Sequence, residues 1–214
     1  INLNHFEKLA ERVLPQYVYE YYFGGANDEI TLRENKQVFQ EIRISPRIMV
    51  DVSKLTTTTN IFGHQIPAPI IFAPTAFHGL ATPQGEVSTA EAATISKTIM
   101  ILSTLSNIRM EDVANAANTP LWFQLYVYKD RELTRELIKR AEESGFSALC
   151  VAVDAPFLGN RERDTRNRFR LPDNLSLPNI MAHPGEHLVQ ESSGSALTTY
   201  FSTLLDQSLN WKDI

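Results

Sequence analysis

Residues 121–153 read LWFQLYVYKDRELTRELIKRAEESGFSALCVAV, and this stretch decides the fold. Residues 121–126 form an apolar run interrupted only by Gln124, and residues 148–153 form a continuous apolar run. The segment between them is amphipathic, and one face of its helical pattern carries Leu133, Leu137, Ile138 and Ala141. Apolar strands on either side of an amphipathic helix indicate two parallel strands joined by a helical crossover.

The same alternation extends toward the N-terminus, with apolar runs at 69–73 and 99–102 and helical patterns at 84–97 and 110–117. The four runs begin 22 to 30 residues apart, which suits the first half of a (β/α)8 barrel in the α/β class. A doubly wound sheet is the alternative. It is disfavoured because no glycine-rich phosphate loop follows the first run.

The flanking regions have different patterns. Helical spacing, Pro15, Gly24 and the caps Asn27 and Asp28 predict three N-terminal helices. After Asn160 the sequence becomes charged and then rich in proline and serine, which indicates a long connection with one short helix near 202–209. We therefore expect one domain in three parts: a helical segment at 1–62, four βα units at 63–159 and a long loop at 160–214.

Composition narrows the function. The net charge of −5 over 214 residues does not indicate nucleic-acid binding. No apolar run approaches the roughly 20 residues that a membrane helix needs, and the single cysteine, Cys150, lies in an apolar run where an inert buried thiol is expected. We expect a cytoplasmic protein, with a peroxisome as the alternative, and no metal site.

In barrels of this type the reactive residues lie at the carboxyl ends of the strands. These ends read Pro74-Thr75-Ala76, Ser103-Thr104-Leu105, Gln124-Leu125-Tyr126 and Asp154-Ala155-Pro156. Any one of them is explained equally well by a helix cap or a satisfied strand end. Four polar ends in succession favour a shared site.

Six long segments carry a family resemblance: YEYYFGGANDE (19–29), PRIMVDVSKLTTTT (46–59), PIIFAPTA (69–76), FQLYVYKDR (123–131), VDAPFLGNRERD (153–164) and NRFRLP (167–172). The chain resembles the N-terminal part of the FMN-dependent 2-hydroxy-acid oxidases, which include glycolate oxidase and lactate oxidase. The resemblance implies that FMN contacts Thr75, Ala76, Ser103 and Gln124, with Pro74 shaping the loop beside the flavin.

The resemblance also implies substrate contacts. Tyr21 and Tyr126 would hold a small 2-hydroxy acid, Asp154 would stabilise a protonated histidine base, and Arg161 would offer a donor near the substrate entrance. Simpler explanations remain open for three of these residues. Tyr21 suits a helix face covering the core, Asp154 a helix cap, and Arg161 a solvated surface.

Several expected parts do not match any residue of this chain. Three expected parts would follow Ile214: the histidine base, the arginine for the substrate carboxylate and the phosphate-binding glycines of the last strands. The base is expected there because none of the five histidines has its sequence context. We therefore expect the C-terminal half of the barrel to come from elsewhere in the functional protein. The resemblance further implies a homo-oligomer, tetrameric or larger.

Three functions remain in competition at this point. The first is an oxidase that uses oxygen and releases hydrogen peroxide. The second is a dehydrogenase of the same family that passes electrons to quinone or cytochrome. The third is a catalytically inactive half-barrel that serves as a binding or assembly module.

Leu105 generates a prediction about substrate size, because it stands where plant glycolate oxidases have tryptophan. The smaller side chain should leave room for a methyl group, so lactate should be accepted at least as well as glycolate. A methyl group in an apolar pocket discriminates by about 1–3 kcal/mol. Leu105→Trp should shift the ratio of the two kcat/KM values toward glycolate. An unchanged ratio in a folded variant would show that Leu105 does not set the pocket.

Overall fold

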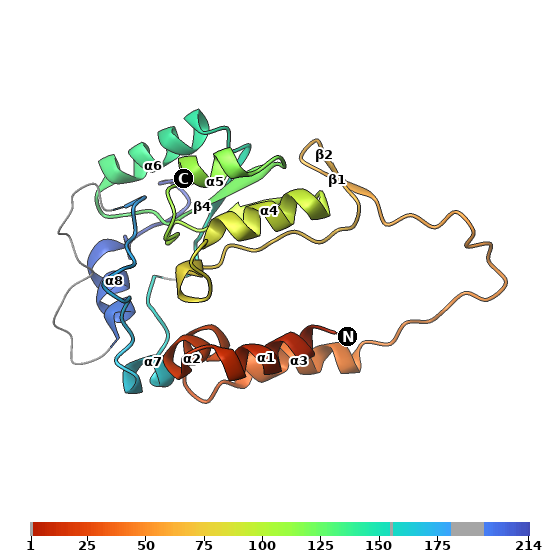
Figure 1. Cartoon of the computed structure of the whole chain (residues 1–214), viewed down its shortest axis with the longest axis horizontal. Coiled ribbons are helices and arrows are strands. Elements are labelled where there is room, and N and C mark those ends of the chain that lie inside the picture. The colour runs from red at the N-terminus through yellow and green to blue at the C-terminus, as the bar shows by residue number, and fades with distance from the viewer. Residues whose placement is uncertain (1, 155, 181–194) are drawn as a thin grey trace.

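The computed structural model describes residues 2–154, 156–180 and 195–214. Three N-terminal helices, α1 (Leu3–Val13), α2 (Gln16–Phe23) and α3 (Ile30–Glu41), form a layer at the bottom of Figure 1, below the α/β body. The Asn2 side chain caps α1 by accepting from the amide of His5 at 3.2 Å. Gly24 ends α2, and its amide donates to the carbonyl of Glu20. These helices confirm the three that the sequence predicted.

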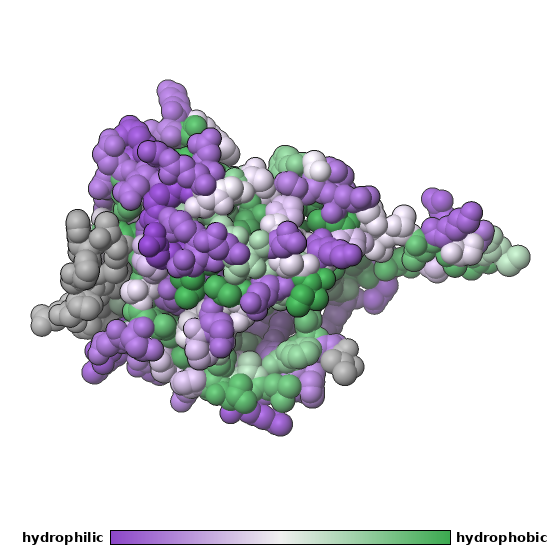
Figure 2. All heavy atoms as spheres, turned by 45° about the horizontal axis from the view of Figure 1, so that its top comes forward, coloured by the Kyte–Doolittle hydropathy of each residue, from purple (hydrophilic) through white to green (hydrophobic). Residues whose placement is uncertain are grey.

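An arm of irregular chain, residues 42–58, links this layer to the body and projects at the right of Figure 1. Its apolar side chains are exposed, as the green surface of the projection in Figure 2 shows, and Met49 is fully accessible. The arm leads into an antiparallel hairpin of β1 (Thr59–Ile61) and β2 (His64–Ile66). The expected helical segment of 1–62 is therefore corrected: its helices end at Glu41, and irregular chain and the first strand of this hairpin follow.

The central sheet contains β3 (Met100–Leu102), β4 (Leu121–Leu125) and β5 (Ala148–Val151), all parallel and in sequential order. The predicted first strand, 69–73, is corrected to a single parallel bridge between Phe72 and Met100. The amide of Phe72 donates to the carbonyl of Ile99 at 2.9 Å, so this segment still occupies the edge position beside β3. The sequential order favours a barrel over a doubly wound sheet.

The two faces of the sheet have different neighbours. Helices α4 (Glu86–Ser96), α5 (Met110–Ala116) and α6 (Arg131–Glu143) contribute to the larger core cluster, which includes Leu102 and Phe123. Ile101 and Trp122 point the other way, into a small cluster that Ile66 of the hairpin helps to form. This alternation is the one expected where one face of a parallel sheet meets an outer helical layer and the other faces a barrel interior.

The segment after β5 contains more helix than its sequence indicated. A short helix, α7 (Glu162–Arg166), packs against α2. The helix expected near 202–209 is corrected to α8 (Ala196–Leu204), which shares only residues 202–204 with it. The expectation of a long loop over 160–214 with one short helix is therefore corrected to a connection that contains two helices among its described residues. No helix among the described residues is long and apolar enough to cross a membrane.

Helix α8 is fixed to the end of β4 by polar contacts. The hydroxyls of Tyr128 and Tyr200 form a hydrogen bond, and both side chains are buried. The ammonium of Lys129 donates to the carbonyls of Ser202 and Thr203 at 2.8 and 3.0 Å, at the carboxyl end of the helix. These contacts place Phe201 edge-on to Tyr126, with ring centroids 5.6 Å apart.

The tyrosine pair gives a stability prediction. Tyr200→Phe should lower the free energy of unfolding by about 1–3 kcal/mol, because the Tyr128 hydroxyl is left buried without its partner. Urea unfolding of the variant measures this change. The double variant Tyr128→Phe/Tyr200→Phe should recover most of the loss, because neither hydroxyl then remains. A double variant that loses as much as the sum of the two single ones would contradict the prediction.

Candidate functional site

The site begins where β3 and β4 end side by side. The side-chain carbonyl of Gln124 accepts from the amide of Thr104 at 3.2 Å and from the hydroxyl of Ser103 at 3.3 Å. The hydroxyl of Thr104 donates to the main-chain carbonyl of Gln124 and accepts from the amide of Tyr126 at 3.3 Å. All three polar side chains, of Ser103, Thr104 and Gln124, are buried. Two strand ends are thereby fixed to each other.

In the residues that the structure describes, the side-chain amide of Gln124 has hydrogen-bond partners for its oxygen but not for its nitrogen. A backbone amide can only donate, so the contact with Thr104 identifies which side-chain atom of Gln124 is the oxygen. The Nε2 group is buried and has no hydrogen-bond partner among the described residues. A buried N–H group without a partner costs about 1–3 kcal/mol, so this group is expected to have a partner in the functional protein.

The loop after the first strand lies beside this pair of strand ends. Pro74 and Thr75 are exposed and Ala76 is half-buried. The hydroxyl of Tyr22 donates to the carbonyls of Ala76 and Phe77, at 3.2 and 2.6 Å, and so ties α2 to the loop. Phe77 itself has φ = 61°, in the left-handed region that non-glycine residues rarely adopt. The exposed residues of the loop remain available to a ligand.

Tyr21 lies at the junction of α2 and the segment after β5. Its ring stacks on buried Phe169 with centroids 4.4 Å apart. The guanidinium of Arg161 lies 5.4 Å above the same ring and donates to the carbonyls of Tyr21 and Gly24, at 2.5 and 3.2 Å. It also donates to the buried carboxylate of Asp164. Burial and the neighbouring Tyr22 raise the pKa of Tyr21, so its hydroxyl stays protonated at neutral pH.

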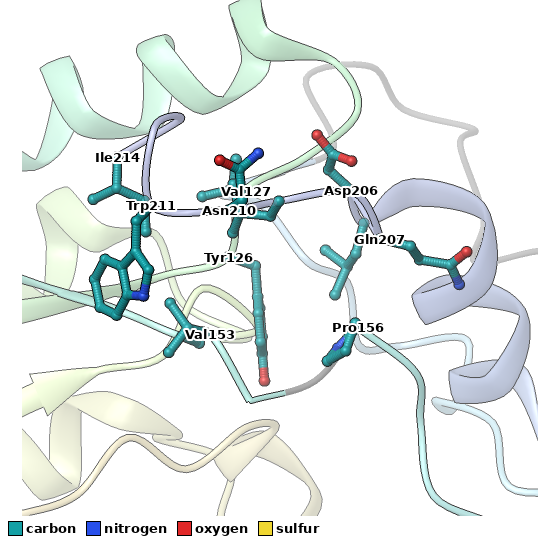
Figure 3. A pocket seen from close by; sticks show the side chains of 12 residues that line it. Tyr126, Val127, Val153, Pro156, Asp206, Gln207, Asn210, Trp211 and Ile214 are labelled. Atoms are coloured by element: carbon teal, nitrogen blue, oxygen red, sulfur yellow. The ribbon is translucent and has the colours of Figure 1, made fainter.

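Tyr126 lines a cavity of about 390 Å³ between the ends of β4 and β5 and the segment 205–214. Figure 3 shows its ring between Val153 and Pro156. Burial raises the pKa of Tyr126, and the nearby charge of Asp154 raises it further. The hydroxyl can therefore serve as a hydrogen-bond donor near neutral pH. Asp154 is exposed and lies three residues after the end of β5.

Most of the predicted residues lie at one end of the sheet, but the side chain of Leu105 points into the core. Its side chain is buried in the larger core cluster, and its carbonyl accepts from the amide of Phe77 at 3.1 Å. A tryptophan there would have to displace core neighbours, so the comparison of lactate with glycolate requires proof that the variant folds. Two of the histidines, His183 and His187, lie outside the described residues. No cluster suited to a metal ion occurs in the described ranges.

Sequence reasoning missed three residues that hold the site together: Tyr22, Glu86 and Thr104. Thr104 sits inside a strand end that the sequence had marked as polar, so its position was available as a signal. Tyr22 follows Tyr21 in a helix rich in tyrosine, and no feature of the sequence distinguishes it. Glu86 begins α4 like many solvated helix-terminal carboxylates, yet it is fully buried.

Comparison with known proteins places these features in a family. The sequence profile of the family described as FMN-dependent dehydrogenase matches residues 10–214. The whole chain is 46% identical to a protein named L-lactate oxidase from Nostoc sp., and covers 60% of it. It is 45% identical to a 2-hydroxyacid oxidase from Dictyostelium discoideum, and covers 54% of it. The chain thus spans little more than half the length of these relatives.

Solved structures agree with the sequence comparison. A crystal structure of mandelate oxidase with (S)-4-hydroxymandelic acid superposes with a TM-score of 0.92 at 31% identity, over 99% of this chain and 59% of that one. An (S)-mandelate dehydrogenase superposes with a TM-score of 0.85 at 34% identity, over 99% and 60% of the two chains. The fold is therefore part of the (β/α)8 barrel of these enzymes, as the sequence predicted.

Arg161 supplies the prediction for this site. Arg161→Lys should lower the free energy of unfolding by about 1–3 kcal/mol, because one ammonium cannot hold the Asp164 carboxylate and two carbonyls in the same geometry. Thermal unfolding measures the change. Arg166→Lys, at an exposed position at the end of α7, is the matched control and should unfold like the native protein. Equal behaviour of the two variants would show that Arg161 does not hold Tyr21.

Proposed function

The chain belongs to the FMN-dependent dehydrogenase family, and from this premise we propose that the protein oxidises a small L-2-hydroxy acid, lactate or glycolate, to the 2-oxo acid. Oxygen is the proposed electron acceptor, and hydrogen peroxide the second product. The observation that carries the proposal is the buried Nε2 group of Gln124, which lacks a partner among the described residues at the end of the sheet where this family binds its cofactor.

The residues at this end fit FMN. The isoalloxazine ring carries acceptors and donors along one edge, and Gln124 and Ser103 offer buried polar groups beside the exposed loop 74–76. We propose that Thr75, Ala76, Ser103 and Gln124 hold the ring while Pro74 shapes the loop. When bound, FMN supplies a two-electron acceptor for the substrate.

The substrate would lie between the two tyrosines. We propose that the protonated hydroxyls of Tyr21 and Tyr126 donate to the carboxylate and to the reacting centre, which fixes the hydroxy acid in one orientation. Arg161 uses three of its five N–H groups within the described residues, so two remain to face an anion. Asp154 would stabilise the histidine that accepts the hydroxyl proton, a base expected outside this chain.

The remaining strands of the barrel are the first partner that we propose. The relatives are longer than this chain, β5 is at the edge of its sheet, and Trp122 has a buried indole N–H without a partner in the described part of the chain. A parallel sheet with open edges is completed when eight strands close the barrel. We propose that residues 1–214 form the N-terminal part of that one domain, which assembles into homo-oligomers in the cytoplasm or a peroxisome.

A dehydrogenase is the second candidate, and the superposition on (S)-mandelate dehydrogenase favours it. The two candidates differ only in the electron acceptor. The full-length protein, loaded with FMN, should consume oxygen and release an equal amount of hydrogen peroxide with lactate or glycolate. Turnover that requires a quinone or cytochrome would establish the dehydrogenase. A protein that binds FMN without turning over any 2-hydroxy acid would instead support a binding or assembly module.

Tyr126 provides the mutational test of the mechanism. Tyr126→Phe keeps the ring against Phe201 and removes only the hydroxyl, so folding should be preserved while turnover falls by about 10-fold or more. Stopped-flow measurement of flavin reduction by substrate reports the loss. Tyr19→Phe, on α2 and stacked on Phe23, is the control and should keep the native rate. Native flavin reduction in Tyr126→Phe would make this tyrosine structural.

A further inference from the structure

Two loops carry the proposed flavin contacts, residues 74–79 after the first strand and 103–107 after β3. Glu86, the first residue of α4, is fully buried behind both of them. One oxygen of its carboxylate, Oε1, accepts from the amide of His78 and from the amide of Asn107, each at 3.1 Å. A single carboxylate oxygen therefore joins the two loops.

Further contacts join the loop 74–79 to the loop 103–107. The side-chain oxygen of Asn107 accepts from the amide of Gly79 at 3.1 Å. A Cβ at Gly79 would lie 2.9 Å from that oxygen and 2.8 Å from Cδ2 of Leu175, so a larger residue would require these side chains to shift. The amide of Phe77 adds a contact to the carbonyl of Leu105. The relative position of the loops thus depends on hydrogen bonds rather than on a continuous strand pair.

Tyr22 holds the first loop from the opposite side. Its hydroxyl donates to two consecutive carbonyls, those of Ala76 and Phe77. The left-handed backbone of Phe77 is unfavourable for a residue with a side chain, so external contacts have to maintain it. Tyr22 and Glu86 provide such contacts on the two sides of the loop.

The burial of Glu86 is energetically unfavourable, because burying a carboxylate costs free energy unless its oxygens accept hydrogen bonds. Its second oxygen, Oε2, is buried without a hydrogen-bond partner in the described ranges. Burial lowers the pKa of neighbouring His78, while the charge of Glu86 opposes that change. The two amides that donate to Glu86 belong to the loops that flank the site. The buried carboxylate therefore contacts the site and is not an isolated group in the core.

We propose that Glu86 and Tyr22 are positioning residues that fix the loop 74–79 against the loop 103–107, and so preform the flavin site. This inference rests on the proposed function. Neither residue touches the substrate in this scheme. Both act through the backbone of residues that face the cofactor, so their removal should change FMN affinity and the flavin spectrum.

The test uses the full-length protein, stripped of FMN and titrated with it. Glu86→Leu, which removes the acceptor, should raise the Kd for FMN by about 10-fold or more and shift the flavin absorption bands. Glu86→Gln retains an oxygen for the two amides, and its Kd should stay within about threefold of the native value. Glu91→Leu, at an exposed position on the same helix, is the matched control with native affinity.

The outcomes separate the two proposals. A native protein that binds no FMN refutes the proposed function and this inference together. If the native protein binds FMN, then native affinity and spectrum in Glu86→Leu, or equal losses in Glu86→Leu and Glu86→Gln, overturn the inference alone. If Glu86→Leu does not fold, Tyr22→Phe replaces it, because it removes a single hydroxyl. A raised Kd with a shifted spectrum in Tyr22→Phe supports the positioning role, and native values refute it.

Discussion

The contact between Gln124 and the end of β3 is the constraint on which the rest of the site depends. It exists because Leu102 and Phe123 are paired, which sets Ser103 level with Gln124. A slip of one residue would turn the amide of Gln124 into the apolar core under the helices, where it would be costly to bury. The register of two buried parallel strands therefore decides whether a polar group is presented at the mouth of the barrel.

Segments that are distant in sequence hold the other parts of the site around this contact. Tyr22 reaches the loop 74–77 from the N-terminal helices, and Arg161 fixes the backbone around Tyr21 from beyond β5. Glu86 joins two loops from the start of α4. The N-terminal helical layer is thus more than a cover, because it supplies one proposed substrate contact and supports the loop beside the proposed cofactor.

Continuous apolar runs made β3, β4 and β5 predictable, because a strand buried on both faces leaves few alternatives. The predicted first strand is reduced to a single bridge, because Pro67, Pro69 and Pro74 have no backbone N–H group to donate to a ladder of hydrogen bonds between strands. The polar strand ends were also visible in the sequence and placed Gln124 at a shared site, while the family resemblance implied its contact with FMN. The burial of Glu86 could not be foreseen, because it depends on two loops that meet only after the strands have paired.

The most direct test of the account is a crystal structure of the full-length protein with FMN bound. The account predicts that the flavin ring lies at the carboxyl ends of β3 and β4, with the Nε2 group of Gln124 donating to one of its ring acceptors. The loop 74–76 should contact the same ring. A flavin bound elsewhere, or a Gln124 amide satisfied by another protein group, would contradict the central claim.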